Sequence, residues 1–327
     1  MANAYSIPRP LKLDIVIPTY NRAELLKKAL ASLLLADRPE YLALSIYVVD
    51  NNSKDNTREV IKSFGGIVYY IFETNQGRSH ALNAGISAGR GDIVGFIDDD
   101  EEVREDWLRV IAEWMAKPEV DFLGGPYLGY TDVSLPRWFP ESYCGVIGIT
   151  PAGNFPREFA NDGGPMLLGG NSVIRRSTLL ALGAYNVNLG RTHKALLSCE
   201  DEELFLRLLD AGARGYYLPN LAIFHVVPKN RLSKSYFRHW CFWHGVSKCT
   251  LAGLRSESSK KLFGVPRYLF GRCLREIPNL FTLQVEPKAF EAELGWWDLA
   301  GWLYGAHLIR RAQNRRSIPI QEPEAAQ

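Results

Sequence analysis

The chain has 327 residues, of which 46% are hydrophobic and 23% are charged, a composition typical of a globular protein with a large core. A disordered chain and a small disulfide-bonded scaffold are therefore excluded. The five cysteines are widely spaced and form no CxxC pair, so we expect reduced thiols. Residues 1–10 lack a signal peptide's apolar run, and no stretch reaches the roughly 20 apolar residues of a membrane-spanning helix. We therefore predict a cytoplasmic protein.

The net charge of +2 is unevenly distributed along the chain. Residues 1–225 sum to −6, residues 226–316 sum to +10, and the last eleven residues add −2. A basic segment of this size favours an anionic partner, either a membrane surface or a phosphorylated substrate rather than nucleic acid.

In chain order, short apolar runs alternate with helical patterns in the first third of the sequence. Each run is rich in β-branched residues, and each is followed by a segment with helical apolar spacing. Strands are predicted over residues 13–17, 45–49, 67–72 and 93–97. This alternation predicts an α/β fold with a doubly wound, mostly parallel sheet.

The regular pattern stops between residues 124 and 170, where Gly, Pro and aromatic residues predict one long loop. Helices and strands are predicted again from residue 171 to residue 225, and basic, aromatic helices follow to about residue 316. We predict an N-terminal extension, an α/β domain with two halves, a C-terminal helical extension and a polar tail. Their boundaries are 1–10, 11–228 (halves 11–123 and 124–228), 229–316 and 317–327.

The residues after the predicted strands carry most of the chemical information, because ligands of such sheets bind beyond the strands' carboxyl ends. The first strand is followed by Pro18, Thr19, Tyr20, Asn21 and Arg22. This segment contains neither a GxGxxG motif nor a P-loop, so it does not support a dehydrogenase or an ATPase.

Carboxylates come after two of the strands. Asp50 comes after the second, and Asp98, Asp99 and Asp100 come after the fourth. Adjacent acids repel one another unless a cation compensates, and Mg²⁺ or Mn²⁺ binds such oxygens while retaining positions for substrate phosphates. The alternative is a solvated acidic turn that continues into Glu101 and Glu102.

Three further features each allow a structural and a functional interpretation. Glu200 and Asp201 open a helix, where acids act as caps or, alternatively, as a general base. His225 ends an apolar run as a structural residue or a ligand. The segment from Asn75 through Gly77 to Arg78 is an ordinary turn or a phosphate-binding helix start.

Together and in this order, the motifs resemble the family 2 glycosyltransferases, an inverting group with a GT-A type fold. The resemblance covers about residues 11–245. The matching segments are Ile15 to Arg22, Val48 to Ser53 with Asp55, Asn75-x-Gly77 with Asn83 and Gly85, Phe96 to Asp100 with Trp107-Leu108, Gly169 to Ser172 with Arg175-Arg176, Glu200 to Leu204, and His225.

The resemblance implies a role for each motif. Asp201 is the expected general base, with Glu200 as its alternate, and Asp100 and His225 are the expected metal ligands. The expected acceptor-binding residues are Trp138, Gly170 and Asn171. The expected nucleotide-sugar-binding residues are Pro18, Thr19, Tyr20, Arg22, Asp50, Asn75, Gly77, Arg78, Asp98 and Asp99.

The implied reaction moves a sugar from a nucleoside-diphosphate sugar, with UDP expected, to a hydroxyl of a glycan or lipid-linked acceptor. The metal would neutralise the leaving diphosphate. Basic and aromatic residues together in the C-terminal segment predict peripheral contact with an anionic membrane, although a packed helical cap remains the alternative. A sugar nucleotidyltransferase and an inactive glycan-binding or scaffold protein are the competing functions.

Overall fold

A computed structural model of the chain describes residues 10–131, 134–150, 153–192, 195–255, 259–281 and 287–316. The chain divides into two compact units. Unit 1 consists of residues 1–134, 141–195 and 200–232, and unit 2 consists of residues 135–140, 196–199 and 233–327.

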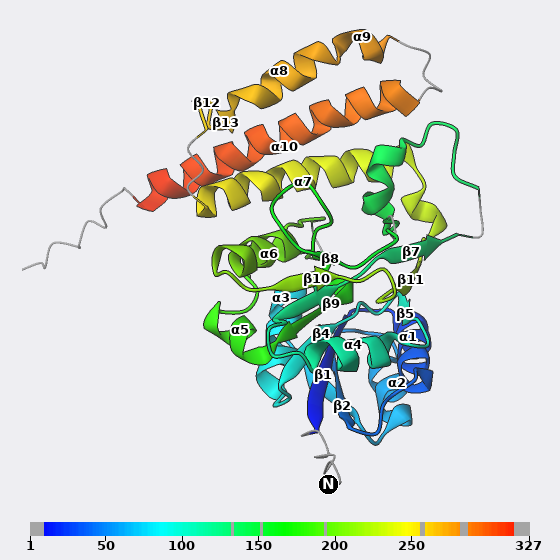
Figure 1. The fold of residues 1–327 in the computed structure, drawn as a ribbon. Coiled ribbons are helices and arrows are strands. Elements are labelled where there is room, and N and C mark those ends of the chain that lie inside the picture. Colours follow the sequence, from blue (N-terminus) through cyan, green and yellow to red (C-terminus); the bar gives the residue numbers. More distant parts are fainter. Residues whose placement is uncertain are drawn as a thin grey trace, which may run out of the picture. The chain divides into compact units, whose positions relative to one another are not determined.

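Unit 1 is built on a sheet in the order β3-β2-β1-β4-β9-β6-β10-β8. The first four of these strands are parallel to one another, as predicted (Figure 1). They are β1 (Leu11–Thr19), β2 (Leu42–Asp50), β3 (Val68–Phe72) and β4 (Ile93–Phe96). The other half contains antiparallel pairs and consists of β6 (Phe122–Gly124), β8 (Arg157–Glu158), β9 (Ser172–Arg175) and β10 (Gly215–Tyr217).

Helices pack on the sheet, and β1 is buried on both of its faces. Leu13, Ile15 and Ile17 belong to one core cluster, and Val16, which points to the other face, belongs to a second. The helices of unit 1 are α1 (Ala23–Leu35), α2 (Thr57–Phe64), α3 (Arg78–Ala88), α4 (Trp107–Met115), α5 (Arg176–Ala181) and α6 (Glu200–Asp210).

The predicted long loop over residues 124–170 is wrong in part, because this segment contains regular structure. It includes β7 (Tyr127–Tyr130), β8 and the 3-10 helix η1 (Glu141–Ile147). In a second sheet, β7 pairs with β11 (Ile223–Val226), which also pairs with β5 (Glu101–Val103). Strands this short are stabilised by distant partners, so no local pattern indicates them.

Unit 2 is helical, and its helices approach one another closely at glycines. A Cβ atom on Gly245 would lie 2.1 Å from the carbonyl oxygen of Asp298, and one on Gly301 would lie 1.9 Å from that of Phe242. These contacts join α7 (Lys234–Leu254) to α10 (Pro287–Arg316), which run side by side in Figure 1. The remaining elements are β12 (Lys261–Leu262), β13 (Val265–Pro266), α8 (Arg267–Arg275) and α9 (Ile277–Leu280). Among the described helices, none combines the length and the apolar character needed to cross a membrane.

Candidate active site

The parallel strands β1, β2 and β4 end at one edge of the sheet and bring Thr19, Asp50 and Asp98 to that edge. Asp99 is buried beneath it and accepts hydrogen bonds from the Thr19 hydroxyl at 2.8 Å and from Arg22 at 2.9 Å. Burial raises the pKa of Asp99 to about 7, against the opposing charge of Arg22.

Asp100 accepts hydrogen bonds from the guanidinium groups of two arginines. Its Oδ2 accepts from Arg22 at 3.0 Å and from Arg231 at 3.2 Å, and it lies 3.6 Å from Nε2 of His225. Burial disfavours the charged carboxylate, but the neighbouring imidazole of His225 and the guanidinium groups of Arg22 and Arg231 hold its pKa below the usual range. The structure thus brings together the two predicted metal ligands, Asp100 and His225.

A third carboxylate, Glu101, completes a cluster that fits a divalent cation. Oxygens of Asp98, Asp100 and Glu101 lie within 4.8 Å of one another. Glu101 is 1% exposed, and burial together with the charges of Asp98 and Asp100 raises its pKa well above the usual range. A hard divalent cation binds such oxygens and would stabilise their ionised forms, so this donor set fits Mg²⁺ or Mn²⁺.

Arg78, the first residue of α3, joins the acids after β4 to those at the start of α6. Its Nε and Nη2 donate to Oδ1 of Asp98 at 3.1 and 3.0 Å. Its Nη1 donates to Glu200 at 3.0 Å and to Asp201 at 3.1 Å. One guanidinium group therefore connects carboxylates that are about a hundred residues apart in the sequence.

Asp201 is the more accessible member of the acidic pair. Its side chain is 26% exposed, compared with 6% for Glu200. The Asp201 carboxylate accepts from Arg78 and from the backbone N–H of Gly169, in η2 (Gly169–Asn171). Burial and Asp98 raise its pKa, while Arg78 opposes the rise. Both partners lie outside α6, so these contacts do not make Asp201 a helix cap.

The loop beside Asp50 is organised by hydrogen bonds. Asp50 is buried and accepts from the backbone of Ser53 at 2.8 Å and from the hydroxyl of Tyr70 at 3.0 Å. Asn51 holds the next loop, because its amide donates to the carbonyl of Asn75 at 2.7 Å and accepts from the backbone of Gly77 at 2.8 Å. These contacts place Asn75 and Gly77 beside the end of β2.

Two of the predicted acceptor-binding residues, Gly170 and Asn171, are buried. Asn171 is fully buried, its amide oxygen accepts from the indole of Trp107, and its amide nitrogen donates to the carbonyls of Pro126 and Leu221. Gly170 is buried and donates to the Tyr127 hydroxyl.

The other predicted site residues differ in exposure and location. Trp138 lies in unit 2, where it packs against Phe237 and Phe290. Pro18 is half-buried in β1, and Tyr20 is exposed just after it.

Sequence reasoning missed Glu101 and Arg231. Glu101 entered only through the alternative of a solvated acidic turn, whereas in the structure it pairs with His225 across β5 and β11, which buries it. Arg231 lies in a 3-10 turn, η3 (Lys229–Arg231), and no sequence pattern indicates its contacts.

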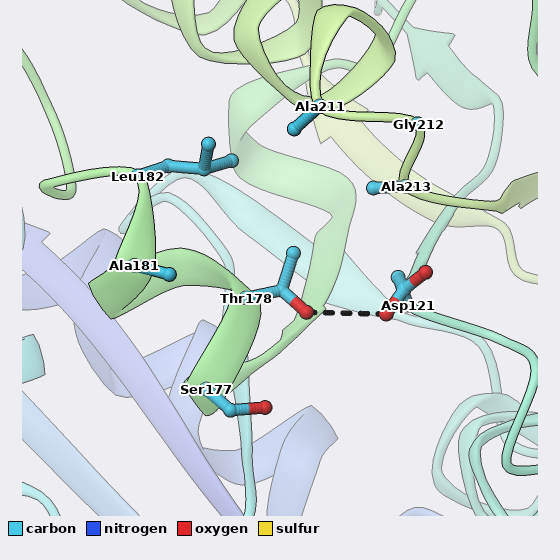
Figure 2. Close-up of a pocket in the computed structure, with 8 residues that line it drawn as sticks. All are labelled: Asp121, Ser177, Thr178, Ala181, Leu182, Ala211, Gly212 and Ala213. Carbon is cyan, nitrogen blue, oxygen red and sulfur yellow. Dashed lines mark hydrogen bonds between the residues drawn. The ribbon is translucent and has the colours of Figure 1, made fainter.

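A shallow surface depression of about 390 Å³ lies away from these acids, between α5 and the end of α6. Figure 2 shows Thr178 and Asp121 in its lining, joined by a hydrogen bond of 3.1 Å. The Asp121 carboxylate is thus already hydrogen-bonded to Thr178. The other lining residues are Ser177, Ala181, Leu182, Ala211, Gly212 and Ala213. This depression therefore offers little reactive chemistry.

The comparison with known families agrees with this arrangement of acids. The family model described as "Glycosyl transferase family 2" matches residues 14–183. The chain belongs to glycosyltransferase family 2. The match covers β1 from Asp14 onward, β2, β3, β4, α3 and the acids after β4.

Relatives of this glycosyltransferase include the succinoglycan biosynthesis protein ExoM of Rhizobium meliloti. It is 23% identical over 261 residues, which cover 78% of this chain and 80% of that protein. An N-acetylglucosaminyltransferase of Rhizobium meliloti is 28% identical over 247 residues, which cover 72% of this chain and 55% of that protein.

Two solved structures share the GT-A fold of this glycosyltransferase. The mannosyltransferase PcManGT of Pyrobaculum calidifontis, in complex with GDP-Man and Mn²⁺, has a TM-score of 0.54 and 20% identity and covers 94% of this chain and 76% of that one. TarS of S. aureus (residues 1–349) with UDP-GlcNAc has a TM-score of 0.53 and 16% identity, covering 94% and 92%. The predicted fold class is confirmed.

Proposed function

We propose that this glycosyltransferase moves a sugar, with inversion, from a UDP-sugar to a hydroxyl of a glycan or lipid-linked acceptor in the synthesis of a surface polysaccharide. The names of two similar proteins support this: ExoM is a succinoglycan biosynthesis protein, and TarS is solved with UDP-GlcNAc. A protein of Campylobacter jejuni that is 34% identical over 31% of this chain is named a glucosyltransferase acting on an undecaprenol-linked glycan.

The observation that carries the proposal is the bridge made by Arg78. Asp98 belongs to the acids that the resemblance assigns to the donor, and Asp201 is the proposed base. Both bond the same guanidinium group, at 3.0 and 3.1 Å. The donor-binding and proton-accepting groups therefore lie within one site, as direct transfer to an acceptor requires.

Asp201 accepts the proton of the acceptor hydroxyl as that oxygen attacks the anomeric carbon. The raised pKa of this carboxyl makes it a better base than an ordinary aspartate. Arg78 and the N–H of Gly169 hold the carboxylate in place. Because the base and the leaving diphosphate are on opposite faces of the sugar, the anomeric configuration inverts.

Asp98, Asp100, Glu101 and His225 are the residues that would hold Mg²⁺ or Mn²⁺. Bound there, the cation would neutralise charge on the leaving diphosphate. Thr19 and Arg22 orient Asp99 beside this group through their hydrogen bonds. In the proposed donor site Asp50 faces the nucleobase, and Pro18, Tyr20, Asn75 and Gly77 line the nucleotide pocket.

Unit 2 is proposed to contact an anionic membrane, where a lipid-linked acceptor would lie. Three large side chains in this part of the chain are exposed: Tyr268 (63%) and Leu274 (59%) lie on α8, and Phe281 (85%) directly follows α9. Exposed Arg267 and Arg275 accompany them on α8. Exposed apolar groups beside arginines suit the interface of an anionic bilayer.

The test is a transfer and hydrolysis assay with a panel of nucleoside-diphosphate sugars, in Mn²⁺ and in EDTA. Wild-type protein is expected to turn over a UDP-sugar only with the cation, and Asp201→Asn is expected to lower turnover by about 100-fold or more with a similar melting temperature. Asp210→Asn, at the other end of α6, is the matched control. Turnover of the Asp201→Asn variant within a few-fold of wild type would remove Asp201 from the mechanism.

A further inference from the structure

A buried arginine contacts both predicted metal ligands. Arg231 is 9% exposed, its Nη2 donates to Oδ2 of Asp100 at 3.2 Å, and its Nη1 lies 3.2 Å from Nε2 of His225. These are the carboxylate oxygen and the ring nitrogen that face each other at 3.6 Å. The guanidinium group therefore contacts polar atoms of two residues that are proposed to hold the cation.

A guanidinium group has only donors, so its contact with Nε2 of His225 is a hydrogen bond in the tautomer that leaves Nε2 unprotonated. In that tautomer the Nε2 lone pair accepts the hydrogen bond from Arg231 and is not available to a metal, because ligation requires the same lone pair. Oδ2 of Asp100 also accepts from Arg22 at 3.0 Å, so it is already neutralised by cationic donors. A cation arriving alone has to displace the guanidinium group of Arg231 from its buried partners.

A diphosphate would offer Arg231 another partner. A guanidinium group binds phosphate oxygens through parallel N–H donors, and the cation in this site would bridge the same phosphates. Arg231 stands in a turn next to exposed Lys229 and Asn230, six residues after His225.

We propose that Arg231 is a diphosphate-binding residue that occupies the metal position in the ligand-free protein and moves onto the donor's phosphates when the cation binds. The proposal rests on the proposed function of the site. It makes cation and nucleotide binding cooperative, because each ligand removes a cost from the binding of the other. Arg231 would thereby keep the cation site closed until a donor arrives.

The experiment measures Mn²⁺ binding by electron paramagnetic resonance and UDP binding by calorimetry, for wild type and Arg231→Gln. In wild type, UDP is expected to strengthen Mn²⁺ binding by about 10-fold or more. In Arg231→Gln, Mn²⁺ alone is expected to bind more tightly than to wild type, while UDP with Mn²⁺ binds about 10-fold more weakly. Opposite changes in two affinities are not expected from a structural role, which would weaken both.

Two further variants keep the result interpretable. Arg231→Lys retains the charge without the planar fork and is expected to give intermediate affinities, and it replaces Arg231→Gln if that variant does not fold. Arg214→Gln removes an exposed arginine paired with Glu158 and should change neither affinity. Mn²⁺ binding that is unchanged or weaker in both Arg231 variants overturns the role of Arg231, whereas a wild type that binds neither Mn²⁺ nor UDP overturns the proposed function.

Discussion

The carboxylate of Asp201 lies directly against the backbone of Gly169. A Cβ atom at residue 169 would come within 2.0 Å of Oδ1 of Asp201 and 2.3 Å of its carboxyl carbon. Real atoms do not approach this closely, so any side chain at residue 169 has to displace the carboxylate. The observed position of the Asp201 carboxylate, the proposed base, therefore requires glycine at residue 169.

Gly169→Ala is expected to reduce kcat by about 10-fold or more, because a misplaced base loses its reach to the acceptor hydroxyl. The change in melting temperature should be small, since the partly exposed Asp201 side chain can rotate. Gly145→Ala is the control, because a Cβ there meets no atom within 4 Å. Unchanged kcat in Gly169→Ala would mean that catalysis tolerates a displaced Asp201.

Arg78→Gln is expected to move the acidic limb of the kcat–pH profile to higher pH. The charge of Arg78 lowers the pKa of Asp201, so its removal raises that pKa further. Since the base acts only when deprotonated, activity should fall more at pH 6 than at pH 9. Arg78→Lys should restore part of the profile, whereas an equal loss at every pH would indicate a purely structural role.

Glu200→Gln is expected to stabilise the ligand-free protein at pH 8 but not at pH 4. Burial raises the pKa of Glu200 to about 7 from its usual 4.5, so ionisation in the folded state costs free energy that is fully present above pH 7 and absent below 4.5. Glutamine keeps an oxygen for Arg78 and removes that cost, so the free energy of unfolding at pH 8 should rise by about 1–3 kcal/mol. Denaturant titrations of wild type and Glu200→Gln at pH 4 and pH 8 measure this difference in the free energy of unfolding. Destabilisation at pH 8 would show that the ionised carboxylate is needed by Arg78.

Unit 2 is expected to bind anionic but not neutral vesicles at low salt, and added NaCl should release the protein because it screens the attraction. Arg267→Glu with Arg275→Glu should weaken co-sedimentation. The same charge change in unit 1, Lys27→Glu with Lys28→Glu on exposed positions of α1, should have little effect. Wild-type protein that stays in the supernatant at low salt would support a packed helical cap instead.

The parallel half of the sheet and the acids beyond its strands were predictable from the amino-acid sequence. Runs such as residues 13–17 and 93–97 are local and strongly apolar, and parallel strands bring the residues at their carboxyl ends to one edge. Asp98 and Asp100 could thus be placed at this edge before any contact was known. The order of the motifs was also enough to recognise the family, which the match over residues 14–183 confirms.

The partners of those acids depend on contacts between distant segments and became known from the folded structure. Glu101 is buried because β5 pairs with β11 more than a hundred residues later, and Arg231 reaches Asp100 across a similar separation in the sequence. Asn171 matched a motif, yet its amide is used entirely by buried partners. Burial and ion pairing depend on which distant segments meet, and no local pattern of residues contains that information, because the contacts form only when the chain has folded.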